Sequence, residues 1–282
     1  MPAGLLLAGA TAGLGASFRL MRFPDLTVEG SFLLGAAVWA AGTLHGWDTT
    51  LSSLAGVTAG AACGGVTALL SRIFRIDRFL AGILVTAACY SLALMVLRVS
   101  NLGLYDMPDL FFPGFDLGGT PWVESSAFGI LTAAGMGLWF KLRVGIRARM
   151  AAINPAFVEA VSGRSLPYLV GGLALTNAAA AASGMAFSRF QGFVDVGMGQ
   201  GVLIVALAGF AIGEACVSWL PLNLVAQTML AALVGSVLYQ IALGAALSAG
   251  VPAAATRLLS AFLVLAFLIL QTRRGALAEQ PL

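Results

Sequence analysis

The sequence predicts an all-α, polytopic helical membrane protein, and three observations support this fold class. Of its 282 residues, 60% are hydrophobic and only 10% are charged, and the mean hydropathy is +0.96. Soluble domains carry about 25% charged residues, so this chain has too few charges to cover a soluble surface. Its apolar residues form repeated runs of about 15 to 27 residues, close to the roughly 20 that a helix needs to cross a bilayer. The alternating strands of an outer-membrane barrel are absent.

We expect about nine transmembrane segments, within a range of eight to ten. Each candidate is an apolar run, and the turns between the runs carry charged residues. The expected segments span residues 3–18, 31–45, 52–71, 79–97, 126–140, 166–187, 200–218, 222–248 and 254–271. Together they form a single transmembrane domain over residues 1–282.

Lysine and arginine residues are distributed unevenly between the two sides that these segments define. If the segments alternate in direction, most of these residues fall on one side, and only Arg98, Arg189 and Arg257 fall on the other. Cytoplasmic loops carry the excess of positive charge in membrane proteins, so the richer side is predicted to be cytoplasmic. We therefore expect the N-terminus outside and the C-terminus inside.

One long loop, residues 98–125, lies on the expected external side. It contains Asp106, Asp109, Asp116 and Glu124, together with prolines and several aromatic residues. A loop of this length and composition is more typical of a folded cap or a docking surface than of a simple linker.

Glycine recurs at helical spacing in two of the expected segments. Gly56, Gly60 and Gly64 form one ladder, and Gly9 and Gly13 form another. Small residues at this spacing let helix backbones approach closely in lipid. The ladders predict either helix packing within the chain or a seam between two chains.

The stretch from residue 22 to 31 interrupts the apolar sequence, and Pro24 and Gly30 disfavour a continuous helix there. Asp25 and Glu29 are four residues apart, so a helical turn would place both carboxylates on one face. Burying a carboxylate costs at least about 2.5 kcal/mol on insertion scales, so such groups usually face a cavity or a partner. Two interpretations remain open: a substrate pathway, or a cytoplasmic turn in which Asp25 caps the next helix with Arg22 as counter-ion. The candidate pathway residues are Asp25, Thr27, Glu29 and Ser31.

A second interruption lies at residues 189–201, where alternating glycines make a poor helix. The candidate pathway residues here are Gln191, Phe193 and Asp195. Both interruptions contain the pattern Phe-x-Asp followed by an apolar residue, at 23–26 and at 193–196. Interrupted helices in two halves of a membrane protein indicate a pathway at the repeat interface.

Motifs for catalysis and metal binding are missing from the sequence. The single lysine, Lys141, does not follow a glycine, so there is no Walker A motif. A single histidine, His45, cannot complete a Ser-His-Asp set, and Cys63, Cys89 and Cys216 are scattered among apolar residues. We therefore expect no enzyme activity, no cofactor and no metal site. The net charge of +3 reflects loop bias and does not indicate nucleic-acid binding.

The longest cytoplasmic element is expected at residues 147–164. Asn154 suits a helix N-cap, Pro155 suits the first helical position, and Gly163 can end the helix. Such a helix either anchors on the membrane surface or forms the contact through which an ATPase moves the membrane domain. The candidate coupling residues are Arg149, Asn154, Pro155, Phe157, Glu159 and Gly163.

Several stretches of the chain resemble permease subunits of bacterial ABC importers, in the group related to ribose-type and branched-chain amino acid permeases. The resemblance is greatest to the branch with uncharacterised substrates. It follows the family's order over most of residues 15–215, in stretches at 18–37, 75–84, 154–163, 172–177, 193–199 and 212–215. One departure concerns the coupling contact: Ala152 and Ile153 stand where relatives often carry Gly-Asp.

The resemblance implies a permease homodimer in the bacterial cytoplasmic (inner) membrane, with two separate ATP-binding subunits and a periplasmic or lipid-anchored solute-binding protein. It also implies that residues 147–164 contain the coupling helix, and that the segments at 25–31 and 193–201 lie near the translocation path. The solute would be a small organic molecule of the amino acid, sugar or nucleoside class, moved by alternating access. The sequence alone does not name it, although amino acids or close analogues are preferred.

Two other functions stay open at this point. An ion- or proton-coupled secondary transporter would work without ATP and would use Asp25, Glu29, Asp195 or Glu214 as its ion site. A passive channel or structural subunit is the second alternative. The capped cytoplasmic helix favours the importer, because a self-powered carrier does not require it.

Overall fold

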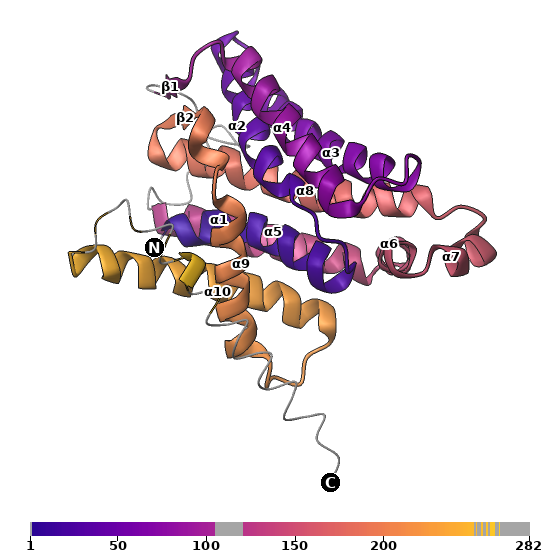
Figure 1. Cartoon of the computed structure of the whole chain (residues 1–282). Coiled ribbons are helices and arrows are strands. Elements are labelled where there is room, and N and C mark those ends of the chain that lie inside the picture. The colour runs from indigo at the N-terminus through magenta and orange to yellow at the C-terminus, as the bar shows by residue number, and fades with distance from the viewer. Residues whose placement is uncertain are drawn as a thin grey trace.

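The computed structural model describes residues 2–104 and 121–250, with a few further positions between 252 and 265. Figure 1 shows a bundle of helices that differ in direction, with one two-stranded sheet. The helices are α1 (Pro2–Gly15), α2 (Thr27–Leu44), α3 (Thr49–Arg72), α4 (Arg78–Leu97), α5 (Pro121–Lys141), α6 (Arg143–Ile153), α7 (Pro155–Ser162), α8 (Leu166–Gln191), α9 (Val202–Val217) and α10 (Leu224–Ser248). A π-helical turn, η1 (Ala16–Leu20), extends α1, and a 3-10 turn, η2 (Val196–Gly199), precedes α9.

The all-α polytopic fold is confirmed, but the count of nine spans is not. Within the described ranges, seven helices are long and apolar enough to cross a membrane, or eight if the bent pair α5 and α6 forms one span. The ninth expected segment, residues 254–271, lies largely outside the described residues. Most of the external loop lies outside them as well, since residues 105–120 are not described.

Side-chain caps explain where several helices begin. The carboxylate of Asp48 accepts a hydrogen bond from the backbone N–H of Thr50 at the start of α3. Asp77 accepts from the N–H groups of Phe79 and Leu80 at the start of α4. Asn223 accepts from the N–H of Ala226 at the start of α10. Each bond satisfies a backbone donor that the first helical turn leaves free, so these polar residues set the ends of the spans.

The glycine ladders pack inside the chain. A Cβ atom on Gly64 would lie 2.1 Å from the carbonyl oxygen of Leu173, and one on Gly60 would lie 2.4 Å from the Cβ of Ala181. Gly9 and Gly13 approach the same helix, α8, from the other side, against Ser183 and Thr176. These glycines bring α3 and α1 against α8, because van der Waals contact is what holds helices together in lipid. The first interpretation of the ladders, packing within the chain, therefore holds.

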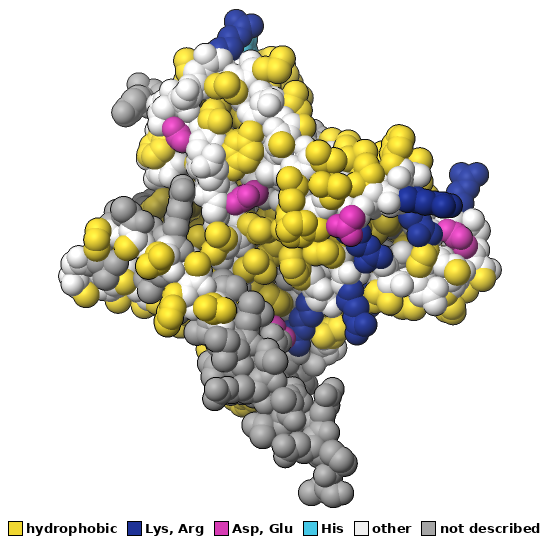
Figure 2. Space-filling view, in the orientation of Figure 1, with side chains coloured by type: hydrophobic (Ala, Val, Ile, Leu, Met, Phe, Trp, Pro, Cys, Tyr) yellow, Lys and Arg dark blue, Asp and Glu magenta, His cyan; other side chains and the backbone are white. Residues whose placement is uncertain are grey.

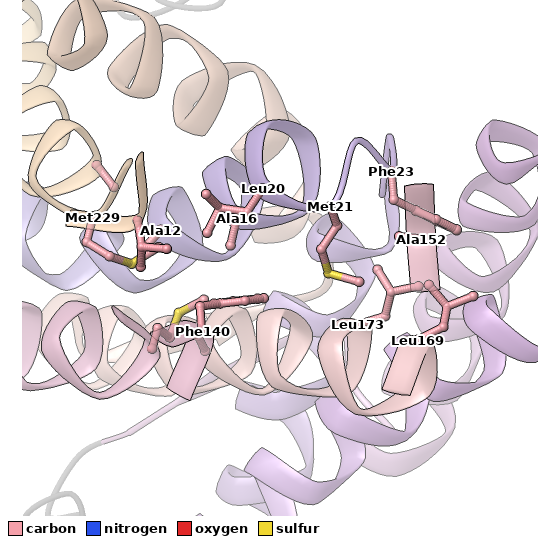
Figure 3. Close-up of a cluster of buried hydrophobic side chains, with 14 of the residues drawn as sticks. Ala12, Ala16, Leu20, Met21, Phe23, Phe140, Ala152, Leu169, Leu173 and Met229 are labelled. Carbon is pink, nitrogen blue, oxygen red and sulfur yellow. The ribbon is translucent and has the colours of Figure 1, made fainter. Parts of the chain in front are cut away.

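A cluster of buried apolar side chains fixes the chain where α1 ends. Met21 and Phe23 are almost completely buried, although they lie in the non-helical stretch that follows η1. Figure 3 shows them with Ala152 of α6 and with Leu169 and Leu173 of α8. Most of the interruption is therefore packed into the molecule, although Arg22 is exposed.

The basic residues gather at one end of the molecule. Figure 2 shows Lys and Arg side chains clustered where Figure 1 places α6 and α7. Arg78 donates to the backbone oxygens of Arg22 and Ala152 at this end, and Arg147 donates to the hydroxyl of Tyr168. We call this region the basic end, and the positive-inside rule predicts that it faces the cytoplasm.

A small sheet joins two segments at the other end of the spans. Strand β1 (Asn101–Gly103) pairs antiparallel with strand β2 (Phe193–Asp195), and Asn101 stands opposite Asp195. The sheet is too short to alter the fold class. It ties the start of the 98–125 loop to the second interruption.

Candidate functional site

The first interruption is shorter than the sequence indicated. Helix α2 begins at Thr27, so Glu29 and Ser31 lie on its first turns, and only residues 21–26 are non-helical. The chain reverses at Arg22, which has a positive φ of 51°. Arg22 is exposed and does not pair with Asp25, because the ion pairs among the described residues lie elsewhere. The suggested counter-ion is therefore wrong.

Asp25 forms the centre of a buried polar network that joins three helices. Its Oδ1 accepts a hydrogen bond from the backbone N–H of Thr27 at 2.9 Å, as a cap would, and its Oδ2 accepts from Nδ2 of Asn177 at 2.6 Å. The Oδ1 of Asn177 in turn accepts from the hydroxyl of Ser31 at 2.7 Å. The hydroxyls of Thr27 and Thr67 are 2.6 Å apart. We call Asp25, Thr27, Ser31, Thr67 and Asn177 the Asp25 network, and all five are fully buried.

Two contacts, one in the Asp25 network and one beside it, were not foreseen. Asn177 belonged to a stretch that resembles the family, but no feature of the sequence placed it on Asp25, which is 152 residues away. The thiols of Cys63 and Cys89 lie 3.2 Å apart nearby, between α3 and α4. Neither pairing has a signal in residue spacing, because each depends on how the helices pack.

The carboxylates of Asp25 and Glu29 do not share a face. Asp25 precedes the helix and turns toward α8, whereas the Oε1 of Glu29 accepts a hydrogen bond from the backbone N–H of Gly201 at 2.5 Å. Gly201 has a φ of +91° and stands immediately before α9. Gly199 also approaches the backbone oxygen of Glu29 so closely that a Cβ would lie 2.9 Å from it. The first turn of α2, which follows the first interruption, therefore contacts the second interruption.

Two bonds within the segment and one from β1 hold the second interruption together. The Oδ1 of Asp195 accepts from the backbone N–H of Gly197 at 2.7 Å, and its Oδ2 accepts from Nδ2 of Asn101 at 3.2 Å. The Nε2 of Gln191 donates to the backbone oxygen of Phe193 at 3.1 Å. The ring of Phe193 is 37% exposed. The three residues predicted here thus lie together, at the rim of the molecule and not in its core.

A cavity of about 220 Å³ opens beside this second interruption. Residues from α1, α2, α8, α9 and α10 line it, together with the stretch from Met198 to Gly201. The sequence offered no signal for this cavity, because its lining residues come from six separate parts of the chain.

The expected cytoplasmic helix is present at the basic end as α7. The Oδ1 of Asn154 accepts from the backbone N–H of Phe157 at 3.1 Å, Pro155 is the first helical residue, and Gly163 ends the helix with a φ of +75°. The side chain of Phe157 is 53% exposed. Arg149 lies on the preceding helix, α6, and partial burial lowers the pKa of its guanidinium.

Glu159 ties α7 to the ends of two spans. Its Oε1 accepts from the hydroxyl of Ser165 at 2.6 Å and from Nη2 of Arg72 at 3.1 Å. These bonds stabilise the charged form, the bond from Ser165 most of all, and they hold the pKa of Glu159 below its ordinary value. Arg72 ends α3, and Ser165 precedes α8. These bonds connect α7 to the end of α3 and to the start of α8.

A third polar contact lies between η1, α9 and α10. The Nη2 of Arg19 lies 3.4 Å from an oxygen of Glu214 and donates to Oε1 of Gln227 at 2.8 Å. Glu214, an ion-site candidate for a secondary transporter, is thus paired with a cation of the same chain.

Sequence comparisons with known proteins give matches over most of the chain. Residues 4–268 match the family model described as the permease component of branched-chain amino acid transport systems. The chain is 28% identical over 268 residues to a tyrosine transport system permease protein of Clostridioides difficile, covering 95% of this chain and 88% of that one. It is also 28% identical over 211 residues to an uncharacterized protein of Rickettsia prowazekii, covering 74% of each. No solved structure matches significantly.

Permease components of such systems are multi-pass proteins of the bacterial inner membrane that work with ATP-hydrolysing and solute-binding partners. The apolar helices described above and the family match over most of the chain both indicate such a multi-pass membrane protein. The chain belongs to the family of branched-chain amino acid transport system permeases and is the membrane-spanning permease subunit of an ABC-type importer.

Proposed function

We propose that α8 transmits the movement of two ATP-binding subunits from α7 to both interruptions, and that this movement drives alternating access in a permease homodimer. One observation carries the proposal. Helix α8 begins directly after Ser165, which is bonded to Glu159 of α7. It holds Asp25 through Asn177 near its middle and ends at the second interruption. A single helix therefore contacts α7, the first interruption and the second interruption.

The two interruptions contribute to the solute path in different ways under this proposal. Hydrogen bonds inside the protein satisfy the polar groups of Asp25, Thr27 and Ser31. These residues therefore support the path by fixing the first interruption. Glu29, Gln191, Phe193 and Asp195 belong to or contact the second interruption, which borders the cavity, so they are the better candidates for the path itself.

The proposed cargo is a small organic solute, with amino acids or close analogues favoured. The family model is named for branched-chain amino acids, and the Clostridioides difficile relative is named for tyrosine. A soluble or lipid-anchored binding protein on the outer side would deliver the solute, and no catalysis is assigned to this chain. The coupling residues would be Arg149, Asn154, Pro155, Phe157, Glu159 and Gly163.

The test is coupled transport in vesicles that contain the complete importer. Phe157→Ala should lower solute uptake per ATP hydrolysed at least several-fold, because the half-exposed ring of Phe157 is the natural contact on α7. Phe74→Ala is the matched control: Phe74 is also exposed and follows α3 at the basic end, but it lies outside α7.

Equal uptake by Phe157→Ala, Phe74→Ala and the unaltered protein would contradict the role of α7. Vesicles with this chain alone should not accumulate solute. Accumulation against a gradient in such vesicles would favour a self-powered carrier instead.

A further inference from the structure

Two cysteine side chains form a close pair inside the bundle of spans. The sulfur atoms of Cys63, on α3, and Cys89, on α4, lie 3.2 Å apart. Both residues lie well inside helices that are long and apolar enough to cross a membrane. Both thiols are free, and the two residues are buried, with exposed fractions of 7% and 1%. The proposed function assigns no role to this pair.

The distance between the two sulfur atoms suits the formation of a disulfide. Reacting atoms that a protein holds about 3–3.5 Å apart are already at near-attack distance. A disulfide bond is about 2.05 Å long, so the two sulfur atoms must approach by only about 1.1 Å. A metal site does not explain the pair, because the described residues contain no group of three or more Cys, His, Asp or Glu side chains that could hold an ion.

Apolar side chains surround the pair and determine which reagents can reach it. Cys63 and Cys89 belong to a buried cluster that includes Leu33, Leu34 and Val85. Charged reagents enter such surroundings poorly, and cysteines buried in this way are usually inert toward reagents in water. A hydroperoxide that dissolves in the membrane, such as an oxidised lipid, is uncharged and brings its O–O bond to the depth of the spans. The more exposed residue of the pair, Cys63, is the first that it reaches.

The pair also touches the beginning of α2. A Cβ atom on Gly30 would lie 2.8 Å from the Cβ of Cys89 and 3.1 Å from its sulfur. The backbone oxygen of Cys63 accepts a hydrogen bond from the hydroxyl of Thr67 at 3.1 Å. That hydroxyl lies 2.6 Å from the hydroxyl of Thr27, the first residue of α2. A chemical change at the pair therefore acts on the start of this helix.

We propose that Cys63 and Cys89 form a redox site, at which a membrane-soluble hydroperoxide produces a disulfide that fixes α4 against α3 and restrains the second interruption. The sulfur of Cys63 attacks the terminal oxygen of the peroxide and the O–O bond breaks. An alcohol leaves with the thiol proton, and Cys63 becomes a sulfenic acid. The sulfur of Cys89 then attacks that of Cys63, the S–O bond breaks, and water leaves with the second thiol proton. The two thiols lose two electrons, and the O–O bond gains them.

The restraint acts where α4 packs on the start of α2. Closing the disulfide draws Cys89 toward α3 and changes its contact with Gly30. Gly30 follows Glu29, whose carboxylate accepts a hydrogen bond from the backbone N–H of Gly201 in the second interruption. A covalent link beside this contact therefore limits the movement of the second interruption.

The first test follows the thiols by mass spectrometry in the purified importer and needs no substitution. Cumene hydroperoxide should join the peptides of Cys63 and Cys89 with the loss of two hydrogen atoms, and dithiothreitol should separate them in the digest. Cys216 is the internal control, because it is exposed on α9 and should not be joined to either partner. Free thiols at both paired positions, separate sulfinic acids, or a bond to Cys216 would overturn the redox site.

The second test measures hydrogen exchange at residues 193–201 before and after the same treatment. The disulfide should slow exchange there about three- to tenfold in the unaltered protein, because local opening then works against a covalent restraint. Cys63→Ala should show no such change, whereas Cys216→Ala should respond as the unaltered protein does. Equal slowing in Cys63→Ala, or a disulfide without slower exchange, would overturn the restraint. Neither result depends on the solute or on ATP hydrolysis, so the redox site is tested separately from coupling through α7.

Discussion

The two interruptions share a short sequence pattern, and the structure gives them the same local turn in different surroundings. In each, the Asp carboxylate accepts a hydrogen bond from the backbone N–H two residues later: Asp25 from Thr27, and Asp195 from Gly197. Such a bond is the ordinary way in which an aspartate reverses a chain before a helix. The pattern therefore encodes a turn, and what surrounds the turn decides its role.

The first interruption is surrounded by protein. Phe23 is 1% exposed and Asp25 is completely buried, and side chains from α3 and α8 complete the Asp25 network. Breaking a bond in this network would leave a buried polar group with no hydrogen-bond partner, which is costly in a low-dielectric interior. The first interruption therefore has the properties of a fixed pivot.

The second interruption is held mainly by its own backbone and by partly exposed groups. Phe193 is exposed, Gly192 and Gly201 have positive φ angles, and a cavity lies alongside. Regions with few buried contacts and accessible hydrogen bonds open at lower free energy than the core does. This difference predicts that the first interruption anchors the bundle and that the second moves.

The largest effect is expected from the Asp25 network. Asn177→Ala would leave the carboxylate of Asp25 and the hydroxyl of Ser31 without their partner, so it should destabilise the protein by about 2–5 kcal/mol. Thermal unfolding of the purified protein in detergent measures this loss. Asn101→Ala, in β1, is the matched control, because it removes an exposed bond to Asp195 of the second interruption and the cost should stay below about 1 kcal/mol. Equal losses of stability for the two variants would contradict the expected difference between a fixed first interruption and a mobile second interruption.

A smaller effect is expected at Gly201. Its φ of +91° is strained for any residue with a Cβ, so Gly201→Ala should destabilise the protein by about 1–2 kcal/mol and should weaken the bond to Glu29. Gly244→Ala, in α10, is the control, because nothing lies within 4 Å of a Cβ there and the backbone is helical. That control should leave stability unchanged or raise it slightly. A loss at Gly244 as large as that at Gly201 would show that conformation is not the cause.

Local opening should separate the two interruptions without lowering overall stability. Backbone amides at 193–201 should exchange hydrogen faster than those at 21–27 when followed by mass spectrometry. Asn101→Ala should speed exchange at 193–201 by about three- to tenfold, because it removes the side-chain bond that joins β1 to β2 at Asp195. Hydrogen exchange at residues 21–27 should be the same in Asn101→Ala as in the unaltered protein. Faster exchange at the first interruption would reverse the assignment of the moving part.

Most of the fold could be predicted from the sequence because it depends on local properties. The apolar runs predicted eight of the expected segments close to their observed positions. Asn154 and Gly163 predicted both ends of α7. The start of α2 was misplaced, because Gly30 suggested a break. In the structure this glycine allows close contact with Cys89 instead.

The contacts of the site could not be predicted, since they join residues far apart in the chain. Asp25 and Asn177, Glu29 and Gly201, and Arg19 and Glu214 meet only after the helices pack. The four-residue similarity between the interruptions indicated a turn correctly, but it carried no information on burial. Burial is the property that distinguishes the pivot from the moving part.

The smallest effect is expected at Glu159, whose carboxylate also accepts two hydrogen bonds but is exposed to solvent. Its folded pKa is lowered by the bonds from Ser165 and Arg72, so their contribution is present above its ordinary pKa of 4.5 and is lost as the pH falls through the lowered folded value. Melting temperatures of the unaltered protein and of Glu159→Gln should therefore differ slightly at pH 7 and converge below pH 4, about where the carboxylate protonates. Because Glu159 is exposed, water screens its bonds, and the difference should stay well below that of Asn177→Ala. A gap that persists at low pH would mean that Glu159 acts through packing and not through charge.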